Sequence, residues 1–376
     1  MRVLILGPDH PGGSLPPYLD VLAAGLRRHG VTVDRHGSTQ IPYDPDKQRF
    51  WPLDRVLAAA RALADQVNLD AYDLVSLHFG NLEYDQLVPV LWADRPRPPV
   101  VYHVHTLVPT LFRDHLPDPR WNHLVRLGSR SADGYVYFGQ YARHRLAGTV
   151  ADDAPAGVAW LPTTIPPDTA PAARPALAAA LDTPPDLPVI SLYGYAAPWK
   201  DAALLHAGLE RMRVPARIAL TGDFWGDPEQ AGCDLTHATS PVPVGDGELV
   251  VVPGYLGPAD RAALVRASTA GVFPYRPHPS FQGSGAIADY LAHAVPVVAT
   301  KVANMAELAG DAGHIVPTGD PEALAAALDD VASAAAAAKF TRNATAWAEW
   351  FTAEAHAARC LTVYQQVLKC DRRKSA

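Results

Sequence analysis

Four short stretches of the sequence carry residue types that can bind an anion or a sugar, and each follows an apolar run. The first is GPDHPGG, residues 7–13, which comes after the apolar run Val3–Leu6 and before a helical pattern. Backbone amides and the dipole of the following helix can contact an anion at such a position. We expect Gly12 and Gly13 to face a ligand phosphate or an acceptor, with a purely structural turn as the alternative.

The same loop does not match the dinucleotide-binding fingerprint. Gly-x-Gly-x-x-Gly would require a glycine at position 9, where the sequence has Asp9. Asp34, at the end of the next apolar run, is in place for a ribose contact. A nicotinamide cofactor is therefore an alternative and not the expectation.

The second stretch, VVYHVHTL, places His103 and His105 at the end of an apolar run. Side chains alternate along a strand, so the two imidazoles are expected on the same side. Histidines in this order can ligate a metal, but no nearby carboxylate pair completes a ligand set. We predict no metal site and expect a hydrogen bond from His105 to a bound substrate, with a structural histidine as the alternative.

The third stretch, YGYAAPWKDAALL, places Lys200 before an apolar helical pattern, where it can neutralise a phosphate or lie solvated at a helix start. The fourth, FQGSGAIADYLAHAVPVVAT, is a glycine-serine-glycine loop that leads into a helix and then a strand. Gly283, Ser284 and Gly285 can bring backbone amides to a diphosphate. Asp289, about one helical turn later, can accept hydrogen bonds from a ribose.

The elements that must position these residues are strands alternating with helices. Short runs rich in Val, Ile, Leu and Tyr are separated by helical patterns, which is typical of buried parallel strands. The first series comprises Val3–Leu6, Val31–Asp34, Leu74–His78, Val100–Val104, Gly134–Phe138 and Val158–Leu161. The second comprises Val189–Tyr193, Arg217–Thr221, Leu249–Val252, Ala270–Phe273, Val297–Thr300 and His314–Val316.

Two helices are expected from the spacing and composition of their residues. Leu15, Leu19, Leu22 and Leu26 form one apolar stripe, and His29 and Gly30 close that helix. The alanine-rich EALAAALDDVASAAAAAKF predicts a packing helix near the end of the sequence.

These patterns predict two doubly wound α/β domains that face each other across a cleft, with ligands beyond the carboxyl ends of the strands. We expect an N-terminal domain over 1–165, a proline- and alanine-rich linker over 166–187 and a second domain over 188–345. Residues 346–376 are expected to form a helix that packs back toward the N-terminal domain.

Composition excludes several classes of protein. The chain has 376 residues and is 48% hydrophobic, which is enough for two cores. A net charge of -7 and the lack of a Lys/Arg block argue against a nucleic-acid or anionic-membrane surface. Cys233, Cys360 and Cys370 lack metal-ligand spacing, which favours a reduced, cytoplasmic protein.

No apolar run approaches the roughly 20 residues of a membrane span, and MRVLIL is too short for a signal peptide. We expect a soluble, unprocessed protein without stable membrane insertion, and the sequence leaves its oligomeric state open.

The order of these motifs resembles that of the retaining GT-B glycosyltransferases of the GT4 group, over nearly the whole chain. The matching pieces are PDHPGG, the strand-end His105, ADGYVYFGQYARHRL, Lys200, YLGPADRAALVRASTAGVFPY and YLAHAVPVVATKVANMAELAGDAGHIVPTGDPEALAAAL. The last is the most specific, because it is similar to the C-terminal nucleotide-binding signature of that group.

The resemblance implies transfer of a hexose from a nucleotide diphosphate donor, expected to be a UDP-sugar, to an acceptor with retention at the anomeric carbon. No metal or other cofactor is implied. The implied roles are catalysis for His105 and Lys200; donor and diphosphate binding for Gly12, Gly13, Gln282, Gly283, Ser284 and Gly285; ribose binding for Asp289; and base contact for Tyr255 and Leu256.

Three positions depart from the pattern of the group. Phe281 stands where the first acid of a pair contacts the donor sugar, and Gln282 is expected to take over that contact. Tyr195 replaces a phosphate-binding arginine, so Arg276 or Arg143 is expected to substitute. The residues 162–164, PTT, replace a Pro-Asn-Gly turn at the domain junction, with an expected structural effect.

The acceptor is expected to be a small polar molecule or a glycan that meets the N-terminal half, as in natural-product or glycoconjugate biosynthesis. The loops RFWPLDR and TLFRDHLPDPRW can contact it or simply pack on the surface. A GT-B-like protein that binds nucleotide or sugar without transfer is the alternative, because both the first acid and the arginine are absent.

Overall fold

The computed structural model describes residues 1–10, 13–44, 46–47, 49–80, 83–107, 132–148, 150, 153–166, 168–194, 199–222, 235, 238–279 and 281–374. The chain divides into two units. Met1–Trp160 and Ala353–Ala376 form the N-terminal unit, and Leu161–Thr352 form the C-terminal unit. Within the described ranges, no helix combines the length and the apolar character needed to cross a membrane.

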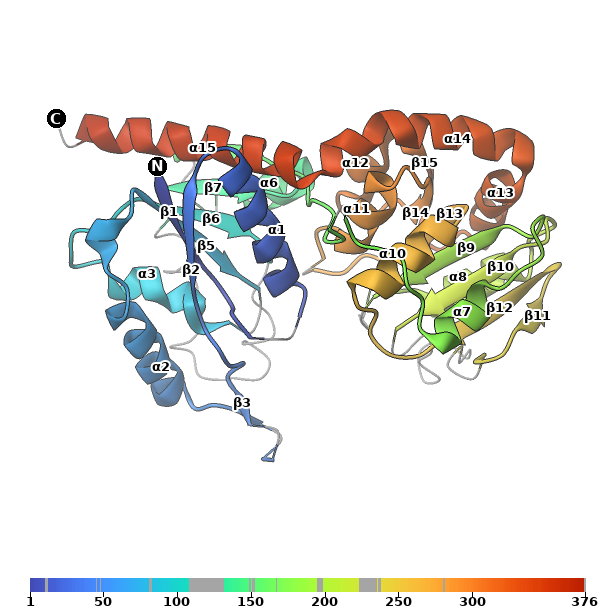
Figure 1. Cartoon of the computed structure of the whole chain (residues 1–376), viewed down its shortest axis with the longest axis horizontal. Coiled ribbons are helices and arrows are strands. Elements are labelled where there is room, and N and C mark those ends of the chain that lie inside the picture. The colour runs from blue at the N-terminus through green and yellow to red at the C-terminus, as the bar shows by residue number, and fades with distance from the viewer. Residues whose placement is uncertain are drawn as a thin grey trace. The chain divides into compact units, whose positions relative to one another are not determined.

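The N-terminal unit is built on a six-stranded parallel sheet with the strand order β2-β1-β5-β6-β7-β8 (Figure 1). Its strands are β1 (Arg2–Leu6), β2 (Thr32–His36), β5 (Leu74–Phe79), β6 (Val100–Val104), β7 (Gly134–Tyr137) and β8 (Ala156–Val158). Its helices are α1 (Leu15–Arg28), α2 (Leu53–Asp65), α3 (Val88–Leu91), α6 (Gln140–Leu146) and α15 (Ala353–Lys374). Two 3-10 turns, η1 (Leu69–Ala71) and η2 (Tyr84–Leu87), and the small hairpin of β3 (Tyr43–Asp44) and β4 (Arg49–Phe50) complete it.

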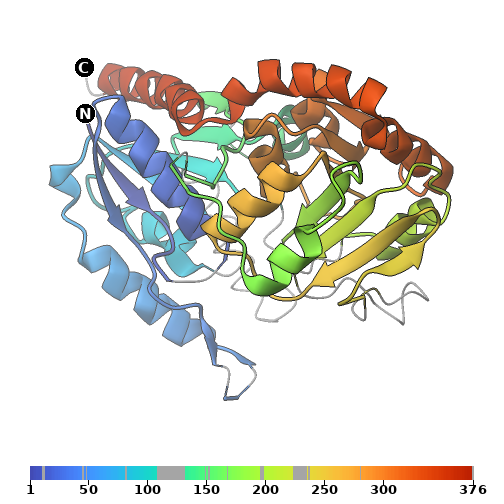
Figure 2. The same cartoon turned by 45° about the vertical axis from the view of Figure 1, so that its right-hand side comes forward.

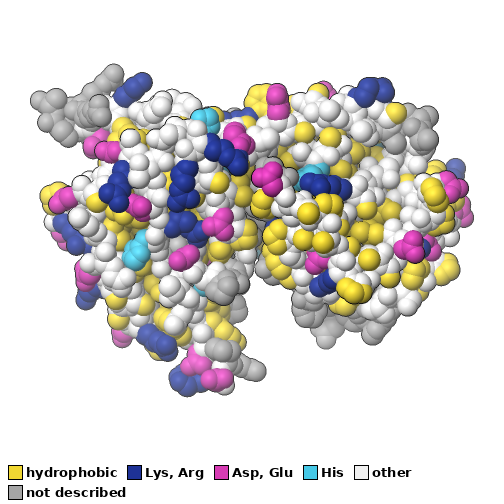
Figure 3. All heavy atoms as spheres, in the orientation of Figure 1, with side chains coloured by type: hydrophobic (Ala, Val, Ile, Leu, Met, Phe, Trp, Pro, Cys, Tyr) yellow, Lys and Arg dark blue, Asp and Glu magenta, His cyan; other side chains and the backbone are white. Residues whose placement is uncertain are grey.

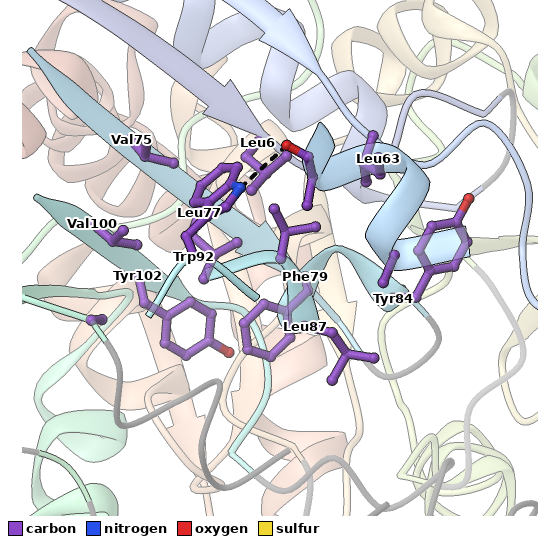
Figure 4. Close-up of a cluster of buried hydrophobic side chains, with 14 of the residues drawn as sticks. Leu6, Leu63, Val75, Leu77, Phe79, Tyr84, Leu87, Trp92, Val100 and Tyr102 are labelled. Carbon is purple, nitrogen blue, oxygen red and sulfur yellow. Dashed lines mark hydrogen bonds between the residues drawn. The ribbon is translucent and has the colours of Figure 1, made fainter. Parts of the chain in front are cut away.

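One face of this sheet forms a hydrophobic core with α2 and η2 (Figure 4). Trp92 is fully buried there, and its indole Nε1 donates a hydrogen bond to the carbonyl of Ala64 at 3.3 Å. Phe79 stacks on Tyr102 with ring centroids 4.3 Å apart. These contacts fill one face of β5 and β6 with apolar side chains, and the polar side chains of both strands therefore lie on the other face.

The other face of the sheet is covered by α1 and α15, which lie side by side in both cartoon views (Figures 1 and 2). Gly25 makes the close approach of the two helices possible. A Cβ at this position would lie 2.6 Å from the carbonyl oxygen of Ala353 and 2.9 Å from the Cβ of Ala357. The last helix of the sequence is therefore part of the N-terminal unit.

The C-terminal unit contains a seven-stranded sheet with the order β11-β12-β10-β9-β13-β14-β15, parallel except for the β11–β12 pair. The strands are β9 (Val189–Tyr193), β10 (Arg217–Thr221), β11 (Val242–Val244), β12 (Gly247–Val252), β13 (Ala270–Phe273), β14 (Val297–Thr300) and β15 (Gly313–Val316). The helices are α7 (Pro175–Leu181), α8 (Ala202–Leu209), α10 (Pro258–Ala267), α11 (Gly285–Ala292), α12 (Met305–Ala309), α13 (Pro321–Ala332) and α14 (Ala334–Trp347), with 3-10 turns η3 (Gly310–Ala312) and η4 (Ala348–Phe351).

The structure confirms the predicted fold class, since each unit is a doubly wound α/β domain with a mainly parallel sheet. Most predicted strands match within two residues. The run Val158–Leu161 was placed too late, because the strand is Ala156–Val158 and the chain leaves the unit after Trp160. The antiparallel edge strand β11 was not predicted, and Ser333 divides the alanine-rich segment between α13 and α14.

The domain limits also differ from those expected. The first unit ends at Trp160, the chain returns to it at Ala353, and residues 166–187 belong to the second unit. Part of that expected linker is α7, whose Leu177 and Ala180 are buried. Arg217 donates hydrogen bonds to the carbonyls of Ala180 and Asp182 at 3.1 and 2.8 Å, which ties the segment to the sheet.

Charged side chains of both signs alternate on the face of the molecule in Figure 3. Several form ion pairs within one unit. Arg2 pairs with Asp34 at 2.8 Å, and Arg211 pairs with Glu322 at 2.9 Å. Asp34, the residue on which the nicotinamide alternative depends, is therefore in an ion pair.

Gly25→Ala is expected to destabilise the N-terminal unit. Overpacking against Ala353 and Ala357 should cost about 1–3 kcal/mol, more than the roughly 0.5–1 kcal/mol that alanine gains in a helix. Urea unfolding followed by circular dichroism measures the change. Gly257→Ala is the matched control, because a Cβ there meets no atom within 4 Å. Equal stability of the two variants would show that α1 and α15 tolerate a wider spacing.

Candidate functional site

The strand order of the C-terminal unit places the candidate site at the carboxyl end of β9. This strand lies between β10 and β13, so the connections leave it in opposite directions. In open α/β sheets, ligands bind at such a switch point. The segments that follow β9 and β13 carry Lys200 and the glycine-serine-glycine loop, which explains why two distant stretches of sequence meet at this edge.

Lys200 lies at this switch point. Its backbone forms an isolated antiparallel bridge with Tyr275, just beyond β13. Gly194, with φ of +130°, makes the turn after β9, and a Cβ there would lie 3.4 Å from the Lys200 Nζ. Burial disfavours the charged ammonium and lowers the pKa of Lys200 to about 7. The amine can therefore gain or lose its proton near neutral pH.

The N-terminus of α11 lies next to the same tyrosine. Ser284 is the N-cap residue of this helix, and its Oγ is 3.4 Å from the Tyr275 hydroxyl. Gly285 has open space where a Cβ would be, so its backbone is accessible to a ligand. Lys200 thus bridges the backbone of Tyr275, and Ser284 contacts the hydroxyl of the same tyrosine. Gly285 follows Ser284 as the first residue of α11, and a helix N-terminus of this kind can bind an anion.

The two preceding residues face the protein. A Cβ at Gly283 would overlap the side-chain amide of Asn304, so this glycine is needed for close packing after β14. Gln282 is 7% exposed, and its backbone carbonyl accepts a hydrogen bond from the backbone amide of Asn304 at 3.1 Å. Both residues support the loop that carries Ser284.

Asp289 is fully buried and is surrounded by hydrogen-bond donors. Its carboxylate accepts from the Thr163 hydroxyl and the Thr164 amide, both at 2.7 Å, and from the Tyr193 hydroxyl. The Arg261 guanidinium lies 3.2 Å away and is itself 5% exposed. A ribose can reach this carboxylate only if one of these four partners moves away.

The sequence PTT at residues 162–164 therefore has a defined structural role. Thr163 and Thr164 supply donors to a buried carboxylate, and Arg261 also donates to the Thr164 hydroxyl at 2.6 Å. Sequence reasoning missed Thr163, Thr164, Tyr193 and Arg261 as partners of Asp289. They come from three separate segments, and no local pattern connects them.

Phe281 belongs to an aromatic cluster in the interior. It is 3% exposed and lies 5.1 Å from the Trp199 ring and 5.4 Å from the Tyr275 ring, between centroids. Arg276, one of the two expected substitutes for the missing arginine, donates its backbone amide to the carbonyl of Trp199, the residue before Lys200, at 2.8 Å. Arg143 is on α6 of the other unit, and Tyr195 is outside the described residues.

The loop after β12 carries the two expected base contacts. Tyr255 is 45% exposed, whereas the Leu256 side chain is 2% exposed. Arg174 holds the loop by donating hydrogen bonds to the carbonyls of Pro253 and Tyr255 at 2.5 and 3.5 Å. Only Tyr255 offers a side chain to a ligand, and Leu256 can contribute backbone groups.

In the N-terminal unit, the glycine loop follows β1 and packs against β5. A Cβ at Gly7 would lie 2.9 Å from the His78 Cβ, so the loop requires glycine at its start. Gly13 is exposed and adopts a φ of +84°. Gly12 is outside the described residues, as is most of TLFRDHLPDPRW. Within RFWPLDR, Trp51 is 7% exposed beneath the Arg55 guanidinium, at 3.8 Å, which indicates packing.

His105 lies just beyond β6 and is partly exposed, whereas His103 within the strand is fully buried. Both belong to a group of seven polar side chains that we name the histidine network: Tyr18, Ser76, His78, His103, His105, His356 and Tyr364. They come from α1, β5, β6, the loop after β6, and α15.

The network is continuous. His105 Nε2 lies 3.1 Å from His78 Nδ1, and His78 Nε2 lies 2.7 Å from Ser76 Oγ. Ser76 Oγ is 2.7 Å from the Tyr364 hydroxyl, which is 2.8 Å from His103 Nε2.

The remaining contacts lead to the backbone. His103 Nδ1 is 3.0 Å from the Tyr18 hydroxyl, which is 2.9 Å from His356 Nε2. His356 Nδ1 lies 2.8 Å from the Trp160 carbonyl oxygen.

Burial keeps the imidazoles of this network neutral. Desolvation lowers the pKa of His105 to about 3 and that of His356 to about 4, and it holds the pKa values of His78 and His103 well below the usual range. At neutral pH each imidazole therefore carries a single N–H.

One group of described residues has ligand atoms close enough for a metal ion. His103, His356 and Cys360 place one ligand atom each within 4.8 Å of one another. The pair His103 and His105, for which the sequence predicted no metal site, does not occur together in this group. Both nitrogens of His103 and both of His356 already contact network partners or the Trp160 carbonyl, so a metal would have to displace the Tyr18 or Tyr364 hydroxyl.

Part of the network has a signal in the sequence. Ser76 and His78 alternate within the otherwise apolar run LVSLHF, and polar residues at i and i+2 of a buried strand require hydrogen-bond partners. His356 and Tyr364 gave no such signal, because they lie more than 250 residues away on an amphipathic helix.

Asp289→Asn is expected to reduce the free energy of unfolding of the C-terminal unit by about 3 kcal/mol or more, because it leaves the Arg261 charge buried without its counter-ion. Urea unfolding measures this loss. Glu322→Gln breaks the exposed pair with Arg211 and is the control, with an expected loss below about 1 kcal/mol.

A double variant separates the two roles of Asp289. Arg261→Met combined with Asp289→Asn should lose less stability than the sum of the single changes, because the two charges depend on each other. If Asp289→Asn unfolds like Glu322→Gln and loses only nucleotide affinity, the residue serves the ligand and not the fold.

Comparison with known proteins agrees with this geometry. Residues 188–334, which include both switch-point segments, match the family described as Glycosyl transferases group 1. No curated protein sequence is significantly similar to the chain.

Solved structures of the same fold cover nearly the whole chain. Sucrose-phosphate synthase from Thermosynechococcus elongatus has a TM-score of 0.70 at 18% identity, over 98% of this chain and 100% of that one. Anabaena HepE in complex with UDP-glucose has a TM-score of 0.64 at 16% identity, over 100% of both chains. The UDP-forming α,α-trehalose-phosphate synthase of Burkholderia xenovorans has 0.64 at 14% identity, over 98% and 99%. The chain therefore shares the fold of these glycosyltransferase structures, and residues 188–334 match the model of the family described as Glycosyl transferases group 1.

Proposed function

We propose that the protein transfers a hexose from a UDP-sugar to a small polar acceptor, with retention of the anomeric configuration. The observation that supports the proposal is that the segments after β9 and β13 meet at the switch point. Lys200 bridges the backbone of Tyr275 there, and Ser284, the N-cap of α11, lies 3.4 Å from the Tyr275 hydroxyl. This arrangement combines a cation with the N-terminus of α11, as binding of a diphosphate requires.

These groups act on the charge that develops during the reaction. When the bond between the anomeric carbon and the diphosphate oxygen breaks, the diphosphate takes the electron pair and gains negative charge. Protonated Lys200 and the amides at the start of α11 stabilise this charge. A preorganised contact of this type contributes on the order of 100-fold in rate.

The nucleotide and the sugar are expected to use different parts of the chain. UDP-glucose is bound by HepE, which has the same fold, and this supports a UDP-sugar as donor. The exposed ring of Tyr255 is available to stack on the base, and His105 is available to a sugar hydroxyl. Gln282 and the ribose contact of Asp289 depend on movement of the groups that now surround them.

The second candidate function is binding of the donor without transfer of its sugar. It is favoured by the burial of Phe281 against Trp199, which leaves no carboxylate where the acid pair begins. Incubation with UDP-glucose and a panel of polyol and aminocyclitol acceptors distinguishes the two. Glycoside formation with retained configuration supports transfer, whereas tight binding without any glycoside or free sugar supports the second candidate.

The pKa of Lys200 generates a prediction for donor binding. With its pKa near 7, most of the amine is neutral at pH 8, and a bound diphosphate raises that pKa. The protein should therefore take up close to one proton at Lys200 when it binds UDP-glucose at pH 8. Its affinity for UDP-glucose should fall by up to about tenfold per pH unit above pH 7. Calorimetry in two buffers of different ionisation enthalpy measures the uptake.

Two variants make this test specific. Lys200→Arg retains a permanent cation, so it should bind UDP-glucose without proton uptake, because arginine stays protonated. Lys200→Met should weaken binding about 10- to 100-fold, from loss of a charge-assisted contact. Undiminished affinity and proton uptake in Lys200→Met would remove Lys200 from the diphosphate site.

A further inference from the structure

The histidine network ends at a group that can only accept a hydrogen bond. The Trp160 carbonyl lies 2.8 Å from His356 Nδ1, so this nitrogen must carry the proton. His356 is neutral, and its Nε2 is therefore bare, that is, it carries no proton and can only accept a hydrogen bond. Two donors reach it, the Tyr18 hydroxyl at 2.9 Å and the Cys360 thiol at 3.5 Å, and we assign the hydrogen bond to Tyr18 because a thiol is the weaker and here the more distant donor.

This single restriction fixes the next three groups. The Tyr18 hydroxyl donates its only proton to His356, so the Tyr18 oxygen accepts a hydrogen bond from His103 Nδ1–H at 3.0 Å. His103 then has a bare Nε2, which accepts from the Tyr364 hydroxyl at 2.8 Å. Each member has one proton to give, and the direction of the bond on one side determines the direction on the other.

The same reasoning reaches the partly exposed end. Tyr364 accepts from the Ser76 hydroxyl, and Ser76 accepts from His78 Nε2–H, both at 2.7 Å. His78 then has a bare Nδ1, which accepts from His105 Nε2–H at 3.1 Å. His105 is left with a bare Nδ1, for which the described residues offer no hydrogen-bond partner.

We propose that the histidine network holds His105 in the tautomer whose Nδ1 is a bare acceptor, so that His105 recognises a hydroxyl of the donor sugar by accepting its proton. His356 and Tyr364 on α15 are then positioning residues for His105. The proposal about the sugar rests on the proposed function, whereas the tautomer does not. Because a carbonyl cannot take up a proton, the network orients His105 and does not conduct protons out of the site.

The opposite direction is disfavoured at the buried end. It would place an unprotonated His356 Nδ1 against the Trp160 carbonyl, so that two acceptors face each other without a proton between them. The cost of such an unsatisfied pair makes the population of this opposite direction about 5- to 150-fold lower than that of the assigned one. Binding of a metal by His103, His356 and Cys360 is the competing arrangement, because it would remove the Nδ1 or Nε2 partner on which this direction depends.

Nitrogen-15 NMR of the imidazoles tests the tautomer directly at pH 7 in the whole protein. We expect the proton on Nε2 in His105 and His78, and on Nδ1 in His103 and His356. His105→Gln identifies the His105 signals by their loss. A proton on His105 Nδ1, or a metal-type shift at His103, would overturn the proposal whether or not the protein transfers a sugar.

Two substitutions at His356 separate positioning from folding. Glutamine can donate to the Trp160 carbonyl and accept from Tyr18, so His356→Gln should keep the His105 tautomer. His356→Leu removes the restriction, and His105 should become a mixture of both tautomers. Tyr84→Phe, which removes another nearly buried hydroxyl of the unit, is the control and should leave the His105 signals unchanged. An unchanged His105 signal in a folded His356→Leu would show that the network does not set it.

The recognition of the sugar is tested with UDP-glucose analogues that carry fluorine in place of one hydroxyl at a time. Fluorine cannot donate a proton, so at the position that faces His105 the analogue should bind about tenfold weaker than UDP-glucose. The penalty should persist in His356→Gln and disappear in His105→Phe. If no position shows a penalty that depends on residue 105 while UDP-glucose itself binds, the sugar part of the proposal fails and the proposed function stands.

Discussion

Buried polar groups must find hydrogen-bond partners, and this constraint determines both parts of the candidate site. A carboxylate or imidazole without a partner in the interior costs more free energy than most single contacts provide. The N-terminal unit meets the constraint with a continuous series of neutral donors and acceptors. The C-terminal unit meets it by surrounding Asp289 with two threonines, a tyrosine and an arginine.

The two units therefore control charge in opposite ways. In the histidine network, desolvation removes charge, so recognition there depends on the direction of hydrogen bonds. At Lys200, burial is sufficient to bring the pKa close to neutrality, so a bound anion of the proposed kind would favour the protonated amine. A sugar, which is neutral, and a diphosphate, which is not, suit these two environments respectively.

The sequence predicted the strands well because buried parallel strands are continuous apolar runs whose limits are set by burial. It also predicted that strand-end loops form the site, and Lys200 and the loop at Ser284 both follow strands at one edge of the sheet. It did not predict what holds Asp289, since Thr163 and Arg261 are contributed by segments more than 20 residues away. The last helix was expected to pack toward the N-terminal domain, but the sequence did not predict that α15 contributes His356 and Tyr364 to the histidine network, because an amphipathic pattern does not specify which side chains its helix contacts.

The position of Asp289 on α11 has a consequence for how the C-terminal unit begins. The helix starts at Gly285, and one turn later the Asp289 carboxylate accepts hydrogen bonds from Thr163 and Thr164, immediately after the chain has entered this unit. The first residues of the unit are thus held by a carboxylate 126 residues later in the sequence, so the beginning of this domain takes its place only when the middle of the domain has folded.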